Sequence, residues 1–123
     1  MAVVLVADDE AHVRWVLSHK LKQAGHEVLL AADGQEALEL ALQRRPELMI
    51  TDLQMPGLGG LELCRRLAAD PATSNIPVVM LTGRGHAPGD EELRDTRIRK
   101  VFSKPFSPAE VMKAVAELTS QAT

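Results

Sequence analysis

The stretch Val3-Val-Leu-Val-Ala-Asp-Asp9 is a short apolar run that ends in two adjacent aspartates. A second run, Leu48-Met-Ile-Thr-Asp52, ends in a third aspartate. Unbroken apolar runs of this length are typical of strands that are covered on both faces, as in parallel sheets. If the two strands are neighbours in one sheet, the three carboxylates converge at one edge of it. We therefore expect this edge to carry the chemistry of the molecule.

Carboxylates that crowd together raise one another's pKa unless a cation lies among them. No histidine or cysteine stands near them at metal-ligand spacing, so the available ligands are oxygens. An oxygen set of this kind suits Mg²⁺, with Mn²⁺ as an alternative, better than Zn²⁺. The competing interpretation is that Asp8 and Asp9 only cap the following helix. The third carboxylate of Asp52 favours the metal site.

The bulk properties predict one domain over residues 1–123, because the length allows a core but no second globular module. The net charge is −3 and the basic residues are scattered, so we expect no nucleic-acid binding. A single cysteine, Cys64, excludes an internal disulfide. No apolar stretch resembles a signal peptide or a membrane span, so we expect a cytoplasmic protein without membrane contact.

Strand and helix patterns alternate five times along the chain. This alternation predicts an α/β fold, a single-domain doubly wound (βα)5 flavodoxin-like sheet with strand order 2-1-3-4-5 and helices on both faces. The expected strands cover residues 3–7, 27–31, 48–51, 77–81 and 100–103. The clearest helices follow the first three strands and begin again at residue 108, whereas residues 83–99 show no helical stripe.

Polar side chains stand at the carboxyl ends of four expected strands: Asp8, Asp9, Asp52, Thr82 and Lys104. In open α/β sheets, ligands bind beyond these ends, at the point where the strand order reverses. With the first and third strands as neighbours, Asp9 and Asp52 would face each other there. Carboxylates, a hydroxyl and an ammonium together can bind Mg²⁺ and a phosphoryl group.

Four pieces of the chain carry a family resemblance: Val4–Glu10, Asp52–Gly57 with Gly60, Leu81–Thr82 and Lys104–Phe106. They resemble the CheY-like receiver domain of two-component response regulators over essentially the whole chain. The resemblance implies that Asp52 accepts a phosphoryl group from a sensor histidine kinase or a histidine phosphotransfer protein. It implies signalling through altered binding of a downstream protein, which the sequence does not identify, and no enzymatic activity beyond Mg²⁺-dependent self-phosphorylation and slow autodephosphorylation.

The same resemblance assigns a role to each site residue. Asp9, Asp52 and the backbone carbonyl of Gln54 would ligate Mg²⁺, and Asp8 would act through a metal-bound water. Lys104 would pair with the phosphoryl oxygens, and Thr82 would then donate a hydrogen bond to them. The peptide bond before Pro105 would be cis, and Gln54 and Arg84 would tune the lifetime of the aspartyl phosphate.

The chain also departs from the family pattern. Val101 stands where an aromatic residue usually moves together with Thr82, and Phe102 should point to the opposite face of its strand. Pro88 and Gly89 fall where the fourth helix should begin, which weakens that helix. We therefore expect an intact phosphoryl-transfer site, a remodelled output surface and a monomer.

Other interpretations remain open. The chain could be a receiver-like interaction module that is never phosphorylated, or the N-terminal fragment of a longer response regulator whose output domain is missing. A phosphatase of the haloacid-dehalogenase type is disfavoured, because such enzymes carry a second aspartate two residues after the nucleophile, and here that position is Gln54.

Overall fold

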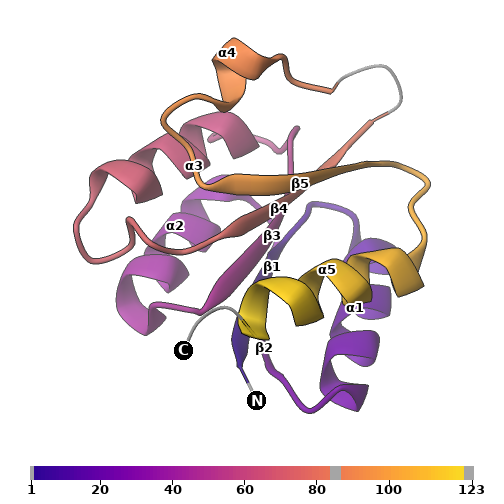
Figure 1. Ribbon diagram of the computed structural model, residues 1–123. Coiled ribbons are helices and arrows are strands. Elements are labelled where there is room, and N and C mark those ends of the chain that lie inside the picture. The colour runs from indigo at the N-terminus through magenta and orange to yellow at the C-terminus, as the bar shows by residue number, and fades with distance from the viewer. Residues whose placement is uncertain (1, 84–86, 121–123) are drawn as a thin grey trace.

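The computed structural model describes residues 2–83 and 87–120 of the chain (Figure 1). Strands and helices alternate along the described chain. The strands are β1 Val3–Ala7, β2 Glu27–Ala31, β3 Leu48–Asp52, β4 Val78–Thr82 and β5 Ile98–Ser103. The helices are α1 Ala11–Gln23, α2 Gly34–Arg44, α3 Gly60–Ala69, α4 Asp90–Leu93 and α5 Pro108–Ser120.

The strands form one parallel sheet in the order β2-β1-β3-β4-β5. This order confirms the predicted flavodoxin-like α/β fold. The strand order reverses at β1 and β3: β2 lies on one side of β1, and β3, β4 and β5 follow on the other. β1 and β3 are neighbours and pair Ala7 with Thr51. The carboxyl ends of β1, β3, β4 and β5 therefore lie along one edge of the sheet.

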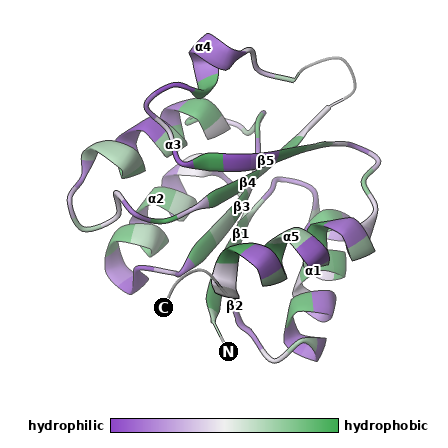
Figure 2. Cartoon of the chain, in the orientation of Figure 1, coloured by the Kyte–Doolittle hydropathy of each residue, from purple (hydrophilic) through white to green (hydrophobic). Residues whose placement is uncertain are grey.

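Helices cover both faces of the sheet, and the sheet separates the core into two layers (Figure 1). α1 and α5 pack on one face, against residues such as Val4, Val6 and Ile50. α2 and α3 pack on the other face, against Leu5 and Met49. Figure 2 shows β1 and β3 in the hydrophobic colour, as expected for strands buried on both faces. Each strand therefore buries alternate side chains in opposite layers.

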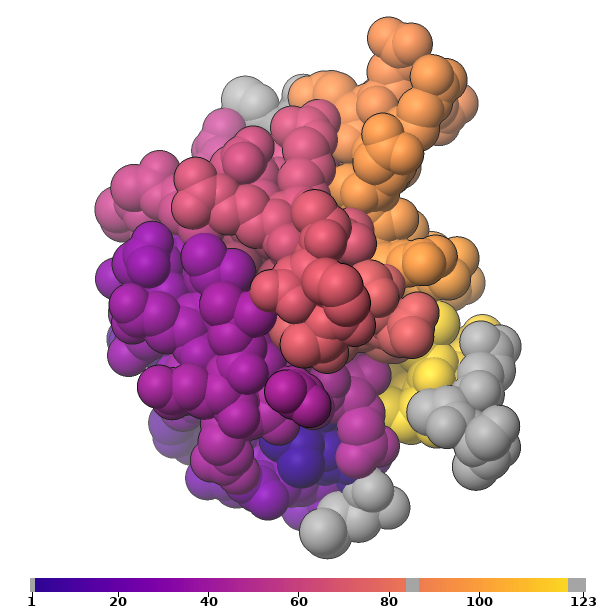
Figure 3. Space-filling model, turned by 90° about the vertical axis from the view of Figure 1, so that its left-hand side faces the viewer, coloured from indigo at the N-terminus to yellow at the C-terminus, as the bar shows by residue number. Residues whose placement is uncertain are grey.

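The short α4 is the main irregularity of the fold. It has only four residues, Asp90–Leu93, none of which is buried. The weak fourth helix expected after Pro88 and Gly89 is thus a single turn, and in Figure 3 its orange segment stands away from the rest of the surface. No helix in the described ranges is long and apolar enough to cross a membrane.

β5 begins at Ile98, two residues before the predicted start, because Val78 pairs with Ile98 ahead of a register shift. Beyond this shift, Val101 packs against the α2–α3 layer and Phe102 against the α1–α5 layer. The two side chains point to opposite faces, as predicted.

Candidate functional site

Asp8 and Asp52 are brought together by the pairing of β1 with β3. Asp52 is the last residue of β3, and Asp8 follows β1 directly, with its backbone N–H donating to the Ala31 carbonyl at 3.1 Å. Both residues are buried, with exposed fractions of 0% for Asp8 and 6% for Asp52. Two carboxylates buried side by side at a sheet edge are costly for stability alone, which favours a chemical role.

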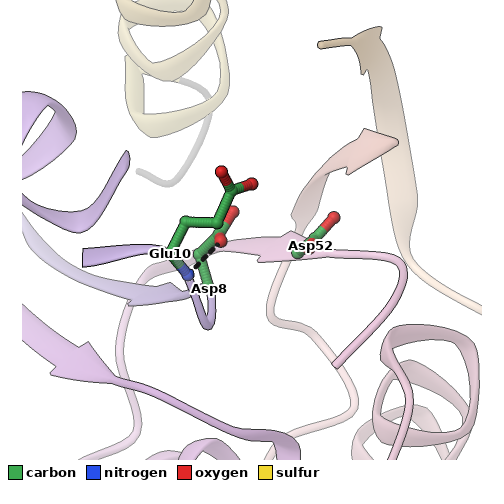
Figure 4. A group of neighbouring side chains, drawn as sticks. All are labelled: Asp8, Glu10 and Asp52. Atoms are coloured by element: carbon green, nitrogen blue, oxygen red, sulfur yellow. Dashed lines mark hydrogen bonds between the residues drawn. The ribbon is translucent and has the colours of Figure 1, made fainter. Parts of the chain in front are cut away.

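The turn between β1 and α1 is held by hydrogen bonds to Asp8. Asp8 Oδ1 accepts from the backbone N–H of Glu10 at 2.9 Å, and the Asp8 carbonyl accepts from Arg14 at 2.8 Å. Figure 4 shows that the side chains of Asp8, Glu10 and Asp52 rise on the same side of the sheet edge. The turn thus presents Glu10 beside the two buried aspartates.

Lys104 enters this cluster from the far edge of the sheet. Its Nζ lies 2.9 Å from Asp8 Oδ2, 2.5 Å from Glu10 Oε1 and 3.4 Å from Asp52 Oδ2. Its backbone N–H donates to the Thr82 carbonyl at 2.7 Å, and the Lys104–Pro105 peptide bond is cis. One ammonium is therefore shared among three carboxylates.

One oxygen each from Asp8, Glu10 and Asp52 lies within 4.8 Å of the others, which makes these residues a candidate cation site in the described part of the chain. Such an all-oxygen set fits a hard divalent cation. Asp9, the predicted direct ligand, is exposed and lies outside this group. Its charge nevertheless acts on Asp52, whose pKa it helps to raise.

Burial and mutual repulsion set the electrostatics of the cluster. Desolvation raises the pKa of Asp52, and the charge of Asp8 raises it further. Desolvation also raises the pKa of Asp8, although the Glu10 N–H and Lys104 oppose this. Lys104 lowers the pKa of the exposed Glu10. Burial alone would lower the pKa of Lys104, but its carboxylate partners raise it above the ordinary value, so the ammonium stays charged.

Thr82 completes the edge as the last residue of β4. Its exposed fraction is 0%, and its Oγ1 finds no hydrogen-bond partner among the described residues. An unpaired buried hydroxyl costs stability, so its presence points to a ligand that it is placed to contact. Carboxylates, an ammonium and a hydroxyl without a partner among the described residues thus lie along one edge of the sheet.

Comparison with known proteins assigns the family. The family described as response regulator receiver domain matches residues 4–116. The chain belongs to this family. Phosphorylation-driven signalling is typical of receiver domains, which are signalling modules and not enzymes that turn over external substrates.

Related proteins of known description support the assignment. This receiver domain is 37% identical over 119 residues to the phosphate regulon transcriptional regulatory protein PhoB of Pseudomonas aeruginosa, covering 94% of the chain and 52% of that protein. It is 34% identical over 118 residues to the DNA-binding dual master transcriptional regulator RpaA of Synechocystis, covering 96% of the chain and 49% of that protein. The receiver domain spans about half the length of these relatives.

Solved structures are similar as well. The chemotaxis response regulator CheY4 of Vibrio cholerae has a TM-score of 0.86 at 33% identity, with 96% of this chain and 98% of that chain covered. The receiver domain of the Francisella response regulator 1452 has a TM-score of 0.88 at 28% identity, with both chains covered completely (100%).

Two glycines shape the loop beyond Asp52 in this receiver domain. Gly57 has a φ of +73°, a left-handed conformation that glycine adopts without strain. A Cβ on Gly60 would collide with the Asp52 carbonyl oxygen, so only glycine lets α3 begin this close to β3. Both glycines therefore serve the backbone geometry of this loop.

The remaining predicted positions are placed as follows. Gln54 is exposed in the loop after β3. Val101 is half-buried on β5. Arg84 lies outside the described residues, so its predicted role stays a prediction.

Glu10 is the residue that the sequence interpretation missed. The resemblance includes Glu10 in the matching Val4–Glu10 segment but assigns it no role. The available signal was a third acidic residue directly after Asp8 and Asp9. Its inward turn depends on the hydrogen bond between its N–H and Asp8, which the order of residues does not reveal.

Proposed function

We propose that this receiver domain is a phosphorylation-dependent signalling switch in which Asp52 accepts a phosphoryl group from a phosphohistidine of a sensor histidine kinase or phosphotransfer protein. One observation carries the proposal: the buried Asp52 carboxylate shares an edge with the Lys104 ammonium, 3.4 Å away, and with the unpartnered Thr82 hydroxyl. Charge-assisted donors of this kind suit phosphoryl oxygens.

In the proposed transfer, a carboxylate oxygen of Asp52 attacks the phosphorus atom. The new P–O bond forms as the P–N bond to the donor breaks, and the donor imidazole keeps the electron pair and takes up a proton. Lys104 then pairs with the phosphoryl oxygens, and Thr82 donates its hydroxyl proton in a hydrogen bond to them. The buried Thr82 hydroxyl thereby gains the partner that it lacks within the described ranges.

The acidic group of Asp8, Glu10 and Asp52 fits a divalent cation, because one carboxylate oxygen of each lies within 4.8 Å of the others. Burial raises the pKa of Asp8 and Asp52, which a bound cation would offset. From the resemblance to receiver domains we propose that Asp9, Asp52 and the backbone carbonyl of Gln54 ligate Mg²⁺, with Asp8 acting through water; Glu10, the third acid of the group, is not among these ligands. The bound cation would neutralise negative charge on the transferring group. Mn²⁺ has similar ligand preferences and could replace it.

The output belongs to the proposal too. We expect phosphorylation to change the binding of a downstream protein. We also expect the protein to be cytoplasmic and monomeric, with residues 1–123 forming one receiver domain. Two relatives are described as transcriptional regulators, and this chain spans about half of each. The alternative is therefore a longer response regulator, in which the phosphorylated site would control a further output domain.

The test is intact-mass spectrometry after incubation with acetyl phosphate and Mg²⁺. We expect one added phosphoryl group, lost when the Mg²⁺ is chelated and absent from Asp52→Asn. Addition of the group to both the native protein and Asp52→Asn would show that the acceptor is a residue other than Asp52. A folded protein that takes up no phosphoryl group from acetyl phosphate or from a histidine phosphodonor would contradict the proposal.

A second candidate function is an interaction module that is never phosphorylated. Val101 and the single-turn α4 favour it, because they alter the surface on which the family usually reports phosphorylation. The same mass measurement separates the two functions, since the module would bind its partner without any mass change.

A further inference from the structure

We propose that Glu10 is a positioning residue for Lys104, which it shares with Asp8 and Asp52 and releases when a phosphoryl group arrives. The inference deepens the proposed function of Asp52 and rests on it. The distances carry it: Lys104 Nζ lies 2.5 Å from Glu10 Oε1 and 3.4 Å from Asp52 Oδ2. The ammonium that should serve the phosphoryl group is bound most closely to a residue outside the proposed transfer chemistry.

A purely structural role does not explain Glu10. It stands at the N-cap of α1, where a side-chain oxygen usually accepts from the first helical N–H groups. Glu10 makes no such capping hydrogen bond to the described helix. Its own N–H donates to Asp8 Oδ1, so the backbone is fixed while the side chain extends to Lys104. The N-cap residue of α1 therefore uses its side chain for this ion pair and not to cap the helix.

The three carboxylates that share Lys104 differ in their freedom to leave it. Asp8 is fully buried, and breaking its ion pair would leave an uncompensated buried charge, which is costly. Asp52 is the proposed phosphoryl acceptor. The Glu10 side chain is 58% exposed, so water can replace Lys104 at little cost. Glu10 is thus the partner that Lys104 gives up when phosphoryl oxygens compete for the ammonium.

This exchange predicts a measurable competition. Glu10 and the phosphoryl group draw on the same ammonium, so removing the Glu10 charge should favour the phosphorylated state. The probe is beryllofluoride with Mg²⁺, a stable mimic of a phosphoryl group on a carboxylate, titrated by calorimetry. We expect Glu10→Gln to bind it about two- to five-fold more tightly than the native protein, the range for a half-exposed ion pair.

Two controls separate the contact from general electrostatics. Glu62 is an exposed acid that pairs with Arg66 on α3, and Glu62→Gln should leave the beryllofluoride affinity unchanged. In a Lys104→Met background, Glu10→Gln should no longer change the affinity, because the shared ammonium is gone. A gain that persists without Lys104 would show that Glu10 acts by its field on the ligand and would overturn the inference.

A crystal structure of the beryllofluoride complex gives a second readout that needs no variant. We expect Lys104 Nζ on a fluoride and no longer within hydrogen-bond distance of Glu10. A retained Lys104–Glu10 pair, or equal or weaker binding by Glu10→Gln, overturns the inference and leaves the role of Asp52 intact. If the native protein itself neither binds beryllofluoride nor accepts a phosphoryl group, the proposed function fails with it.

Discussion

The ammonium of Lys104 lies 3.4 Å from the carboxylate of Asp52 and so joins the outermost strand of the sheet to its centre. The register of the sheet produces this approach, because Asp52 pairs with Leu81 on β4 and Leu81 pairs with Phe102 on β5. Lys104 therefore leaves β5 level with the carboxyl end of β3. The cluster therefore depends on the pairing of β3, β4 and β5.

Asp52→Asn should stabilise the metal-free protein. Burial and the charge of Asp8 raise the pKa of Asp52, so its ionised form opposes folding at neutral pH. Removing that charge should raise the melting temperature at pH 7 by about 3–6 °C, the shift for about 1 kcal/mol in a domain of this size. Thermal unfolding in chelator measures the effect.

The pH dependence gives the sign of the same effect. An acid with a raised pKa binds more protons in the folded state, so stability falls as the pH rises through the interval above its ordinary pKa. The advantage of Asp52→Asn should therefore shrink in acid and grow toward neutrality. An advantage that stays constant across this interval would refute the electrostatic explanation. Mg²⁺ should stabilise the native protein more than the variant.

Thr82→Val should separate stability from switching. The Oγ1 of Thr82 is buried without a partner among the described residues, so an isosteric methyl group should leave the free energy of unfolding unchanged or raise it by up to about 1 kcal/mol. Binding of beryllofluoride should weaken, because valine lacks the hydroxyl that we expect to donate a hydrogen bond to it. Denaturant unfolding and calorimetry measure the two effects. Unaltered binding would show that Thr82 does not contact the phosphoryl group.

Gly60→Ser should destabilise the protein by about 1–3 kcal/mol, the usual cost of overpacking. Its Cβ would collide with the carbonyl oxygen of Asp52 and push α3 away from β3. Gly59→Ser is the matched control, because a Cβ there has 3.7 Å to its nearest neighbour and serine caps helices well. Equal urea midpoints for the two variants would contradict the close approach.

Gln54→Ala should shorten the lifetime of the aspartyl phosphate several-fold. The exposed Gln54 side chain follows Asp52 by two residues, and a smaller side chain leaves more room for an attacking water. Stability should stay within about 0.5 kcal/mol, as for other surface substitutions. Decay of the purified phosphoprotein measures the lifetime. Equal decay rates would remove Gln54 from the proposed role; the same assay tests Arg84.

The fold followed from the sequence because the buried strands are nearly continuous apolar runs and the helices between them carry clear stripes. The positions of Asp8, Asp52, Thr82 and Lys104 followed as well, since each ends a strand and parallel strands end at one edge. The inward turn of Glu10 did not, because a side chain's direction after a strand depends on local hydrogen bonds such as that to Asp8.

The exposed position of Asp9 has the same physical basis, and its role as a direct Mg²⁺ ligand stays a prediction. Asp8 continues the line of β1 into the buried edge, and Asp9, the next residue, is exposed. The extent of α4 was also beyond the sequence pattern, because its four residues bury no side chain and leave no stripe to detect. Irregular segments that pack weakly carry little periodic signal.

The most direct test of the account is to locate the modified residue chemically. Borohydride reduction converts an aspartyl phosphate to homoserine, which tandem mass spectrometry can place in the sequence. After incubation of the native protein with acetyl phosphate and Mg²⁺, we expect homoserine at position 52 and at no other aspartate. Homoserine at Asp8 or Asp9, or phosphorylation of a residue that borohydride does not reduce, would contradict it.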